Sequence, residues 1–256
     1  MKRLYVVCGV LSLLIVACCV FLMIQPVVFP VEVYEETPAV SATTVPKDHP
    51  APTDDPAATA APAYEAPAAL TEAIAQNDEV YAWIRIPGTN VDYPVVQSRT
   101  ADNYYLRRGI DGKYSTAGSI MSEHTYNTTT FEDPVTVLYG HCMRVGTMFG
   151  KLQTTYSGTE QMKEYDTIEI FLPDKKLTYT VFAAVPYDTR HILYNYDFSD
   201  SRIYTMFFDD VFALRSFSAV TLRENKPEYG DKVLILSTCL KGDAASRYLV
   251  MAKLNE

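Results

Sequence analysis

The sequence predicts a mainly β domain over residues 70–256, with one helix expected near its start and another late in the chain. Short apolar runs at residues 134–139, 233–239 and 247–252 have the length and composition that fill buried strands, and turn residues border them. The hydrophobic content of 48% is ordinary for a folded protein, and the predicted domain is long enough to form one substantial core.

The first predicted elements are a helix and a strand. Residues 70–81 predict a short helix, for which Thr71 is the candidate N-cap because its hydroxyl can accept from a free amide of the first turn. The apolar run of residues 134–139 ends at Gly140, so we expect a buried strand that leads into a turn. His141 is the first side chain after that glycine.

Residues 200–217 predict an amphipathic helix. Within them Ile203, Phe207, Val211 and Leu214 recur at spacings of four, four and three residues, which places them on one face of a helix. We expect this apolar face to pack on the β domain.

The last two apolar runs, one ending at Cys239 and one beginning at Arg247, are expected to pair as a β-hairpin. Residues 241–243 (KGD) between them supply the turn. In such a hairpin Cys239 leaves one strand where Arg247 enters the next, so both side chains can reach the same rim of the sheet. His141 joins them if its own strand ends at that rim.

These three side chains are typical of acyl transfer. The thiolate is the reactive form of cysteine, and neighbouring cations such as Arg247 and a protonated His141 favour it. Histidine titrates in the range needed to protonate a leaving amine. The guanidinium of arginine stays charged and offers a planar fork of N–H donors to a tetrahedral oxyanion.

Several sequence blocks resemble those of the sortases, the membrane-bound cysteine transpeptidases of Gram-positive bacteria. Their His, Cys and Arg motifs are matched by residues 139–141 (YGH), 236–239 (LSTC) and 247–250 (RYLV). The opening segments of class B are matched by residues 83–97 (WIRIPGTNVDYPVVQ), 102–106 (DNYYL) and 118–120 (GSI). The resemblance covers residues 70–256.

The resemblance implies a sortase-type closed eight-stranded β-barrel with helices at its N-terminal side and one helix inserted late. It also implies that Cys239 attacks a Thr carbonyl in the C-terminal sorting signal of a secreted protein and forms a thioester. His141 would protonate the departing amine and later deprotonate the incoming one. That acceptor amine would belong to a lipid-linked peptidoglycan precursor or to another protein.

The resemblance further implies peptide-binding roles for Ser237 and Asn103, although both can equally be structural residues. It places residues 187–197 near the substrate groove. No spacing of His, Cys or carboxylate residues resembles a zinc or calcium site, and neither a metal nor a cofactor is expected.

Two positions depart from the class pattern. Cys142 stands directly after His141, where class B sortases usually carry asparagine, and Lys241 stands where some relatives carry an acid. We interpret Cys142 as a small, partly buried residue beside the site, and an oxidative bridge to Cys239 is the alternative. No fourth catalytic residue is assigned.

His124 and His191 are the alternative bases. They lie in residues 123–130 and 188–191, which are polar stretches typical of loops. Neither follows a buried-strand run into a glycine turn as His141 does, so His141 is the predicted base.

Three other functions stay open. A pilin-polymerising sortase would use a lysine amine as acceptor, although residues 55–57 (DPA) lack the aromatic residue of a pilin-sortase lid. A thiol hydrolase of another fold would need an Asn or Asp to orient its histidine, and none is identified. A non-catalytic, membrane-tethered β module would join Cys142 to Cys239 in a structural disulfide.

The N-terminal quarter predicts a single membrane anchor followed by a spacer. Residues 4–24 form an uncharged apolar run that can cross a bilayer as a helix, with cations before it and glutamates after it. We therefore expect residues 1–3 in the cytoplasm and the catalytic domain outside the cell. Residues 25–69 predict an extracellular linker rich in alanine and proline.

Two other interpretations of the apolar run are a cleaved signal peptide and lipidation at residues 15–18 (IVAC). Its length opposes the first, because the core of a signal peptide is about 7 to 15 residues. The apolar residues that follow oppose the second. The formal charge of −9 disfavours nucleic acid as a partner, since nucleic-acid-binding surfaces are basic.

Overall fold

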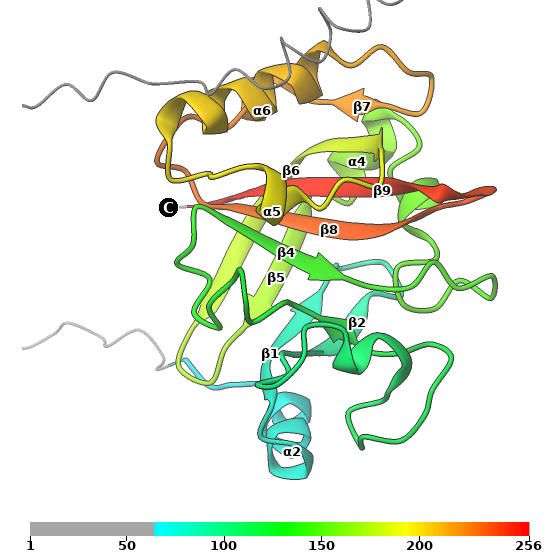
Figure 1. Cartoon of the computed structure of the whole chain (residues 1–256), viewed down its shortest axis with the longest axis vertical. Coiled ribbons are helices and arrows are strands. Elements are labelled where there is room, and N and C mark those ends of the chain that lie inside the picture. Colours follow the sequence, from blue (N-terminus) through cyan, green and yellow to red (C-terminus); the bar gives the residue numbers. More distant parts are fainter. Residues whose placement is uncertain (1–63, 256) are drawn as a thin grey trace, which may run out of the picture. The chain divides into compact units, whose positions relative to one another are not determined.

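The structure is a computed structural model that describes residues 64–255 of the 256-residue chain (Figure 1). The predicted cytoplasmic residues 1–3, the predicted membrane segment 4–24 and most of the predicted linker 25–69 lie outside the described residues. Within residues 64–255, no helix combines the length and the hydropathy needed to cross a bilayer.

Strands dominate the described residues, where nine are present. They are β1 (Val80–Arg85), β2 (Asp92–Val96), β3 (Ile120–Met121), β4 (Val135–Tyr139), β5 (Thr167–Phe171), β6 (Lys176–Tyr187), β7 (Val220–Thr221), β8 (Val233–Leu240) and β9 (Asp243–Leu254). They form one sheet in the order β5-β1-β2-β3-β4-β8-β9-β6-β7, and β5 also pairs with β6. This pairing closes eight strands into a barrel with β7 attached to β6, so the predicted closed eight-stranded β-barrel is confirmed.

Short helices connect and cover the strands. Those of residues 64–255 are α2 (Ala68–Gln76), η1 (Tyr104–Arg107), α3 (Leu152–Thr155), α4 (Thr159–Glu164), α5 (Ile192–Asn195), α6 (Ser201–Ala213) and η2 (Arg223–Asn225). Figure 1 shows α2 and α6 at opposite ends of the view, with α5 in the connection between β6 and α6. The predicted N-terminal helix and late inserted helix are therefore both present.

The alternation of side chains along β8 decides which face carries the predicted nucleophile. Successive side chains of a strand point to opposite faces of the sheet. Leu234 belongs to the core cluster inside the barrel, whereas Ile235 belongs to a second cluster on the face that α6 covers. Cys239 lies four residues after Ile235 and so shares its face. The thiol therefore points to the outside of the barrel.

The predicted bounds of the first helix are wrong at both ends. Helix α2 begins at Ala68, because the amides of Leu70 and Thr71 already donate to the carbonyl of Pro67 at 2.9 and 3.3 Å. Thr71 therefore lies inside the helix and is not its N-cap. The helix ends before Asn77, which takes an extended conformation and leads into β1.

The late helix is shorter than residues 200–217. It begins after Asp200, whose carboxylate accepts from the amides of Arg202 and Ile203, and it ends at Ala213. Leu214 has an extended conformation and is 41% exposed, so its predicted place in the apolar stripe is wrong. The buried face instead consists of Tyr204, Phe207, Phe208, Val211 and Phe212.

Candidate active site

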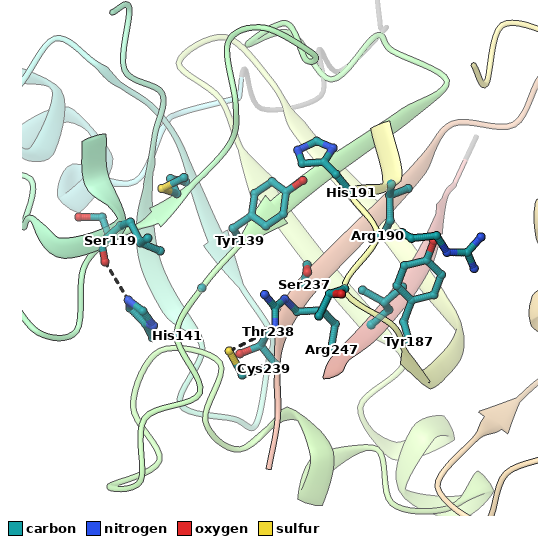
Figure 2. Close-up of a pocket in the computed structure, with 16 residues that line it drawn as sticks. Ser119, Tyr139, His141, Tyr187, Arg190, His191, Ser237, Thr238, Cys239 and Arg247 are labelled. Atoms are coloured by element: carbon teal, nitrogen blue, oxygen red, sulfur yellow. Dashed lines mark hydrogen bonds between the residues drawn. The ribbon is translucent and has the colours of Figure 1, made fainter. Parts of the chain in front are cut away.

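The β8–β9 hairpin places the predicted nucleophile directly opposite the predicted oxyanion partner. Cys239 and Arg247 are register partners, and Leu240 pairs with Asp243 next to the turn, so the predicted hairpin is confirmed. Nη1 of Arg247 donates to the Sγ of Cys239 at 3.9 Å (Figure 2). It also donates to the carbonyl of Ser246 at 3.3 Å. The guanidinium is thus held beside the sulfur.

A β-bulge in β9 produces this register. The pairing shifts between Cys239 and Leu240, which leaves residues 244–246 unpaired opposite them. The carboxylate of Asp243 accepts from the amide of Ala245 at 3.0 Å and from the hydroxyl of Ser246 at 2.6 Å. The bond from that hydroxyl, and then the bond from that amide, hold the pKa of the Asp243 carboxyl below its ordinary value. Bulges of this kind re-aim a side chain, here that of the residue that follows.

His141 reaches the same end of the barrel because β4 runs parallel to β8. Tyr139 pairs with Ser237, and the amide of Gly140 donates to the carbonyl of Ser237 at 3.1 Å. A Cβ at position 140 would lie 2.6 Å from side-chain atoms of both Ile120 and Phe149. Glycine therefore fits here without displacing either side chain, and the chain passes through this narrow space before it presents His141.

The ring of His141 is held by a carbonyl and not by the thiol. Nε2 lies 2.8 Å from the carbonyl oxygen of Leu106, and because a carbonyl only accepts, Nε2 carries the proton (Figure 2). Gly118 makes room for that carbonyl, since its φ is +60° and a Cβ there would lie 2.4 Å from the same oxygen. The other ring nitrogen, Nδ1, is left to exchange a proton with a substrate.

A cavity of about 220 Å³ brings the three predicted catalytic residues together. Cys239, Arg247 and His141 all line it, and in the view of Figure 2 Cys239 lies between the other two. Ser237 lines it as well and is only 6% exposed. None of the described residues that line the cavity is an aspartate or a glutamate, so its charged side chains are basic, and apolar side chains such as Met121 and Leu249 form much of the rest of its wall.

Asn103 lies apart from this cavity. It is exposed, it precedes η1, and it is not among the residues of the cavity wall. Leu106 from the same helical turn lines the cavity instead. The predicted peptide-binding role of Asn103 stays a prediction.

The end of β6 and the segment that leads from it to α6 form another wall of the cavity. Tyr187, Thr189, Arg190, His191 and Ile192 contribute to it. This agrees with the expectation that residues 187–197 lie near the groove.

Both ring nitrogens of His191 are engaged in holding that segment. Nε2 lies 2.7 Å from Oε2 of Glu123, and Nδ1 accepts from the amide of Tyr194 at 3.1 Å. The other alternative base, His124, pairs through Nδ1 with Oδ1 of Asp102 at 2.6 Å and does not line the cavity. The geometry therefore favours His141 as the base.

Cys142 and Cys239 are both free and partly buried. Burial raises the pKa of the Cys142 thiol above its ordinary value, and the nearby Cys239 sulfur adds to the rise. Nε2 of Gln153 lies 3.8 Å from the Cys142 sulfur and donates to the carbonyl of Cys239 at 3.2 Å. Cys142 is thus a partly buried neighbour of Cys239, and its raised pKa favours the protonated thiol.

We expect Cys142 to be alkylated slowly at neutral pH. In a Cys239→Ala variant, iodoacetamide should label Cys142 more slowly than a free cysteine peptide, and the rate should rise as the pH approaches the raised pKa of that thiol. Peptide mass spectrometry of timed samples measures the rate. A Cys142–Cys239 cross-linked peptide in a non-reduced digest of the parental chain would instead support the structural-disulfide alternative.

Gln153 is a residue of the site that carries no signal in the sequence, because it lies in a segment without strong periodicity. Leu106 belongs to the DNYYL block and Arg190 to residues 187–197, but no role was predicted for either side chain. Within residues 64–255, no group of three or more His, Cys, Asp or Glu side chains could hold a metal ion. Gly118, which makes room for the Leu106 carbonyl, lies in the GSI block that the resemblance had already singled out.

A closed eight-stranded barrel with a cysteine–arginine hairpin and a histidine at one rim defines the sortase fold class. The sortase domain family matches residues 84–255, so the chain belongs to the sortase family, and the relatives place it in class B. It is 28% identical over 163 residues to sortase B of Listeria monocytogenes, covering 64% of this chain and 63% of that relative.

Solved structures agree with this assignment. Sortase B from Bacillus anthracis in complex with AAEK1 is similar with a TM-score of 0.64 and 27% identity, covering 76% of this chain and 89% of that one. A Streptococcus pyogenes class B sortase involved in pilus biogenesis is similar with a TM-score of 0.62 and 25% identity, covering 73% and 98%.

Proposed function

We propose that this protein is a cysteine transpeptidase that joins secreted proteins to an amine through a thioester intermediate. The observation that carries the proposal is the hairpin register that sets Nη1 of Arg247 3.9 Å from the Cys239 sulfur, in a cavity that His141 also lines. A thiol beside a permanent cation is suited to attack a carbonyl, because the cation favours the thiolate.

In the first half-reaction, the Cys239 thiolate attacks the Thr carbonyl of a C-terminal sorting signal. The Arg247 guanidinium stabilises the oxyanion of the tetrahedral intermediate. The C–N bond then breaks, and a protonated His141 gives its proton to the departing amine. The secreted protein is left as a thioester on Cys239.

In the second half-reaction, an amine attacks that thioester. His141 takes a proton from the attacking nitrogen, the C–S bond breaks, and the thiolate returns beside Arg247. The bond from Nε2 to the Leu106 carbonyl keeps the ring in one orientation, so Nδ1 is the nitrogen that exchanges the proton in both halves. The acceptor amine belongs to a lipid-linked peptidoglycan precursor.

The proposal includes a membrane-anchored organisation. Residues 1–3 are cytoplasmic, residues 4–24 span the cell membrane once, residues 25–69 act as an extracellular linker, and residues 70–256 form the catalytic domain. The apolar run and the cations before it support this arrangement. It would hold the active site outside the cell, where secreted proteins and wall precursors meet.

A panel of quenched fluorescent pentapeptides tests the proposed reaction. The full chain in detergent micelles is incubated with each peptide, with and without a soluble amine, and the products are read by mass spectrometry. We expect a thioester on Cys239 and an amide product that appears only with the amine. Peptide cleavage that gives only the acid would favour a thiol hydrolase, and no acyl-enzyme with any peptide would favour a non-catalytic module.

A pilin-polymerising role is the second candidate. The similarity to the Streptococcus pyogenes class B sortase involved in pilus biogenesis favours it. The same panel separates the two roles when the amine is varied. Faster transfer to a lysine side-chain amine in a pilin-like peptide than to a peptidoglycan stem-peptide amine would support pilus assembly.

A further inference from the structure

We propose that Gln153 is a positioning residue that holds the end of β8 and thereby aims the Cys239 thiol. This inference rests on the proposed function, since it assigns a further residue to the same site. Gln153 lies in α3, next to Leu152, which is 1% exposed.

The need for such a residue arises where β4 stops. Strand β4 ends at Tyr139, opposite Ser237, and the last backbone bond on this edge runs from the amide of Gly140 to the carbonyl of Ser237. Strand β8 continues beyond that point. Along a strand, the carbonyl of one residue and the amide of the second residue after it face the same edge. The amide of Cys239 is therefore the next group on the edge that β4 leaves, and the carbonyl of Cys239 and the amide of Lys241 follow it.

The side-chain amide of Gln153 forms hydrogen bonds with both the carbonyl of Cys239 and the amide of Lys241. Its Nε2 donates to the carbonyl of Cys239 at 3.2 Å, and its Oε1 accepts from the amide of Lys241 at 3.0 Å. These are the two bonds that one further residue of β4 would make. One donor and one acceptor are needed together, and a glutamine amide supplies both, whereas a carboxylate supplies only acceptors.

This contact completes the support of the nucleophile. Arg247 in β9 pairs with Cys239 on one edge of β8, and Gln153 holds the other edge. With both edges held, the backbone direction at Cys239 is set, and its sulfur stays within reach of the guanidinium. The same Nε2 lies 3.8 Å from the Cys142 sulfur, so a negative charge in place of this amide would face both thiols.

The test compares Gln153→Glu with Gln161→Glu, a matched change at an exposed glutamine of α4. The full chain in detergent micelles is treated with iodoacetamide between about pH 4 and pH 9, and labelling of Cys239 is followed by peptide mass spectrometry. A protonated glutamic acid donates and accepts as the amide does, while its carboxylate repels the Cys239 carbonyl and opposes the thiolate.

For Gln153→Glu, the ratio of variant to parental labelling rates should be near one at the acid end of this range and should fall about tenfold as the glutamic acid ionises. That fall should come above the ordinary glutamate pKa of about 4.3, because the nearby Cys239 carbonyl and thiols oppose the carboxylate. Gln161→Glu should keep a ratio near one throughout. In the peptide-transfer assay, kcat of Gln153→Glu should fall with KM within about twofold, because the thiol and not the peptide site is displaced. A ratio that does not change with pH would overturn the positioning role.

Two further results keep the test decisive. If Gln153→Glu does not fold, Gln153→Ala takes its place and should lower the rate of Cys239 labelling about fivefold at every pH. Labelling of Cys239 in Gln153→Ala at the parental rate would overturn the inference. Labelling needs no peptide substrate. A parental chain that never forms an acyl-enzyme, yet shows the expected labelling ratios, would overturn the proposed function and leave the role of Gln153 at the thiol standing.

Discussion

Replacing Cys239 with alanine is expected to abolish acyl-enzyme formation and transfer with every peptide of the panel. The change removes the sulfur that we expect to form the thioester. Cys142, the other cysteine of the described residues, is partly buried, and its pKa is raised, which opposes the reactive thiolate. Intact-mass measurement after incubation with peptide shows whether any acyl adduct forms. The barrel should stay folded, because Cys239 lies at the rim and contributes little to the core.

The matched control for this variant is Cys142→Ser, which should keep most of the transfer activity. Serine has nearly the same size as cysteine and can still accept from Gln153. An acyl adduct that persists in Cys239→Ala would refute the nucleophile assignment. Loss of transfer in Cys142→Ser, with normal labelling of Cys239, would make Cys142 a participant in the reaction.

Replacing Arg247 with alanine is expected to lower kcat on the order of 10²–10³, the usual cost of one lost oxyanion donor. The guanidinium is the donor that contacts the Cys239 sulfur, and the bulge of β9 holds it there. Steady-state kinetics with the best peptide of the panel measures the loss. KM should change much less than kcat, because the interaction is made mainly in the transition state.

Two variants make the role of Arg247 specific. Arg247→Lys keeps the charge but loses the planar fork, so we expect it to recover thiol labelling more than it recovers kcat. Arg99→Ala removes an exposed arginine that pairs with Asp78 and does not line the cavity, and it should leave kcat unchanged. A loss below about threefold in Arg247→Ala would remove the residue from the oxyanion role.

The parts of the site that could be predicted from sequence are local in the chain. Cys239 and Arg247 are joined by a short turn, so the apolar runs on either side and the KGD turn were enough to predict their pairing. The His, Cys and Arg blocks and the barrel class followed from the resemblance. The bounds of the helices were less predictable. Pro67 and Asn77 set the ends of α2, and Asp200 and the extended Leu214 set the ends of α6.

The amino-acid sequence by itself determined which chemical groups are available: a thiol, an imidazole and a guanidinium at the ends of buried strands. Only the tertiary structure decided how two of them are held. His141 is fixed by a carbonyl 35 residues away, and Cys239 is supported by a glutamine 86 residues away. Strand and turn patterns arise from neighbours in the chain, whereas these contacts exist only once the closed barrel brings distant segments together.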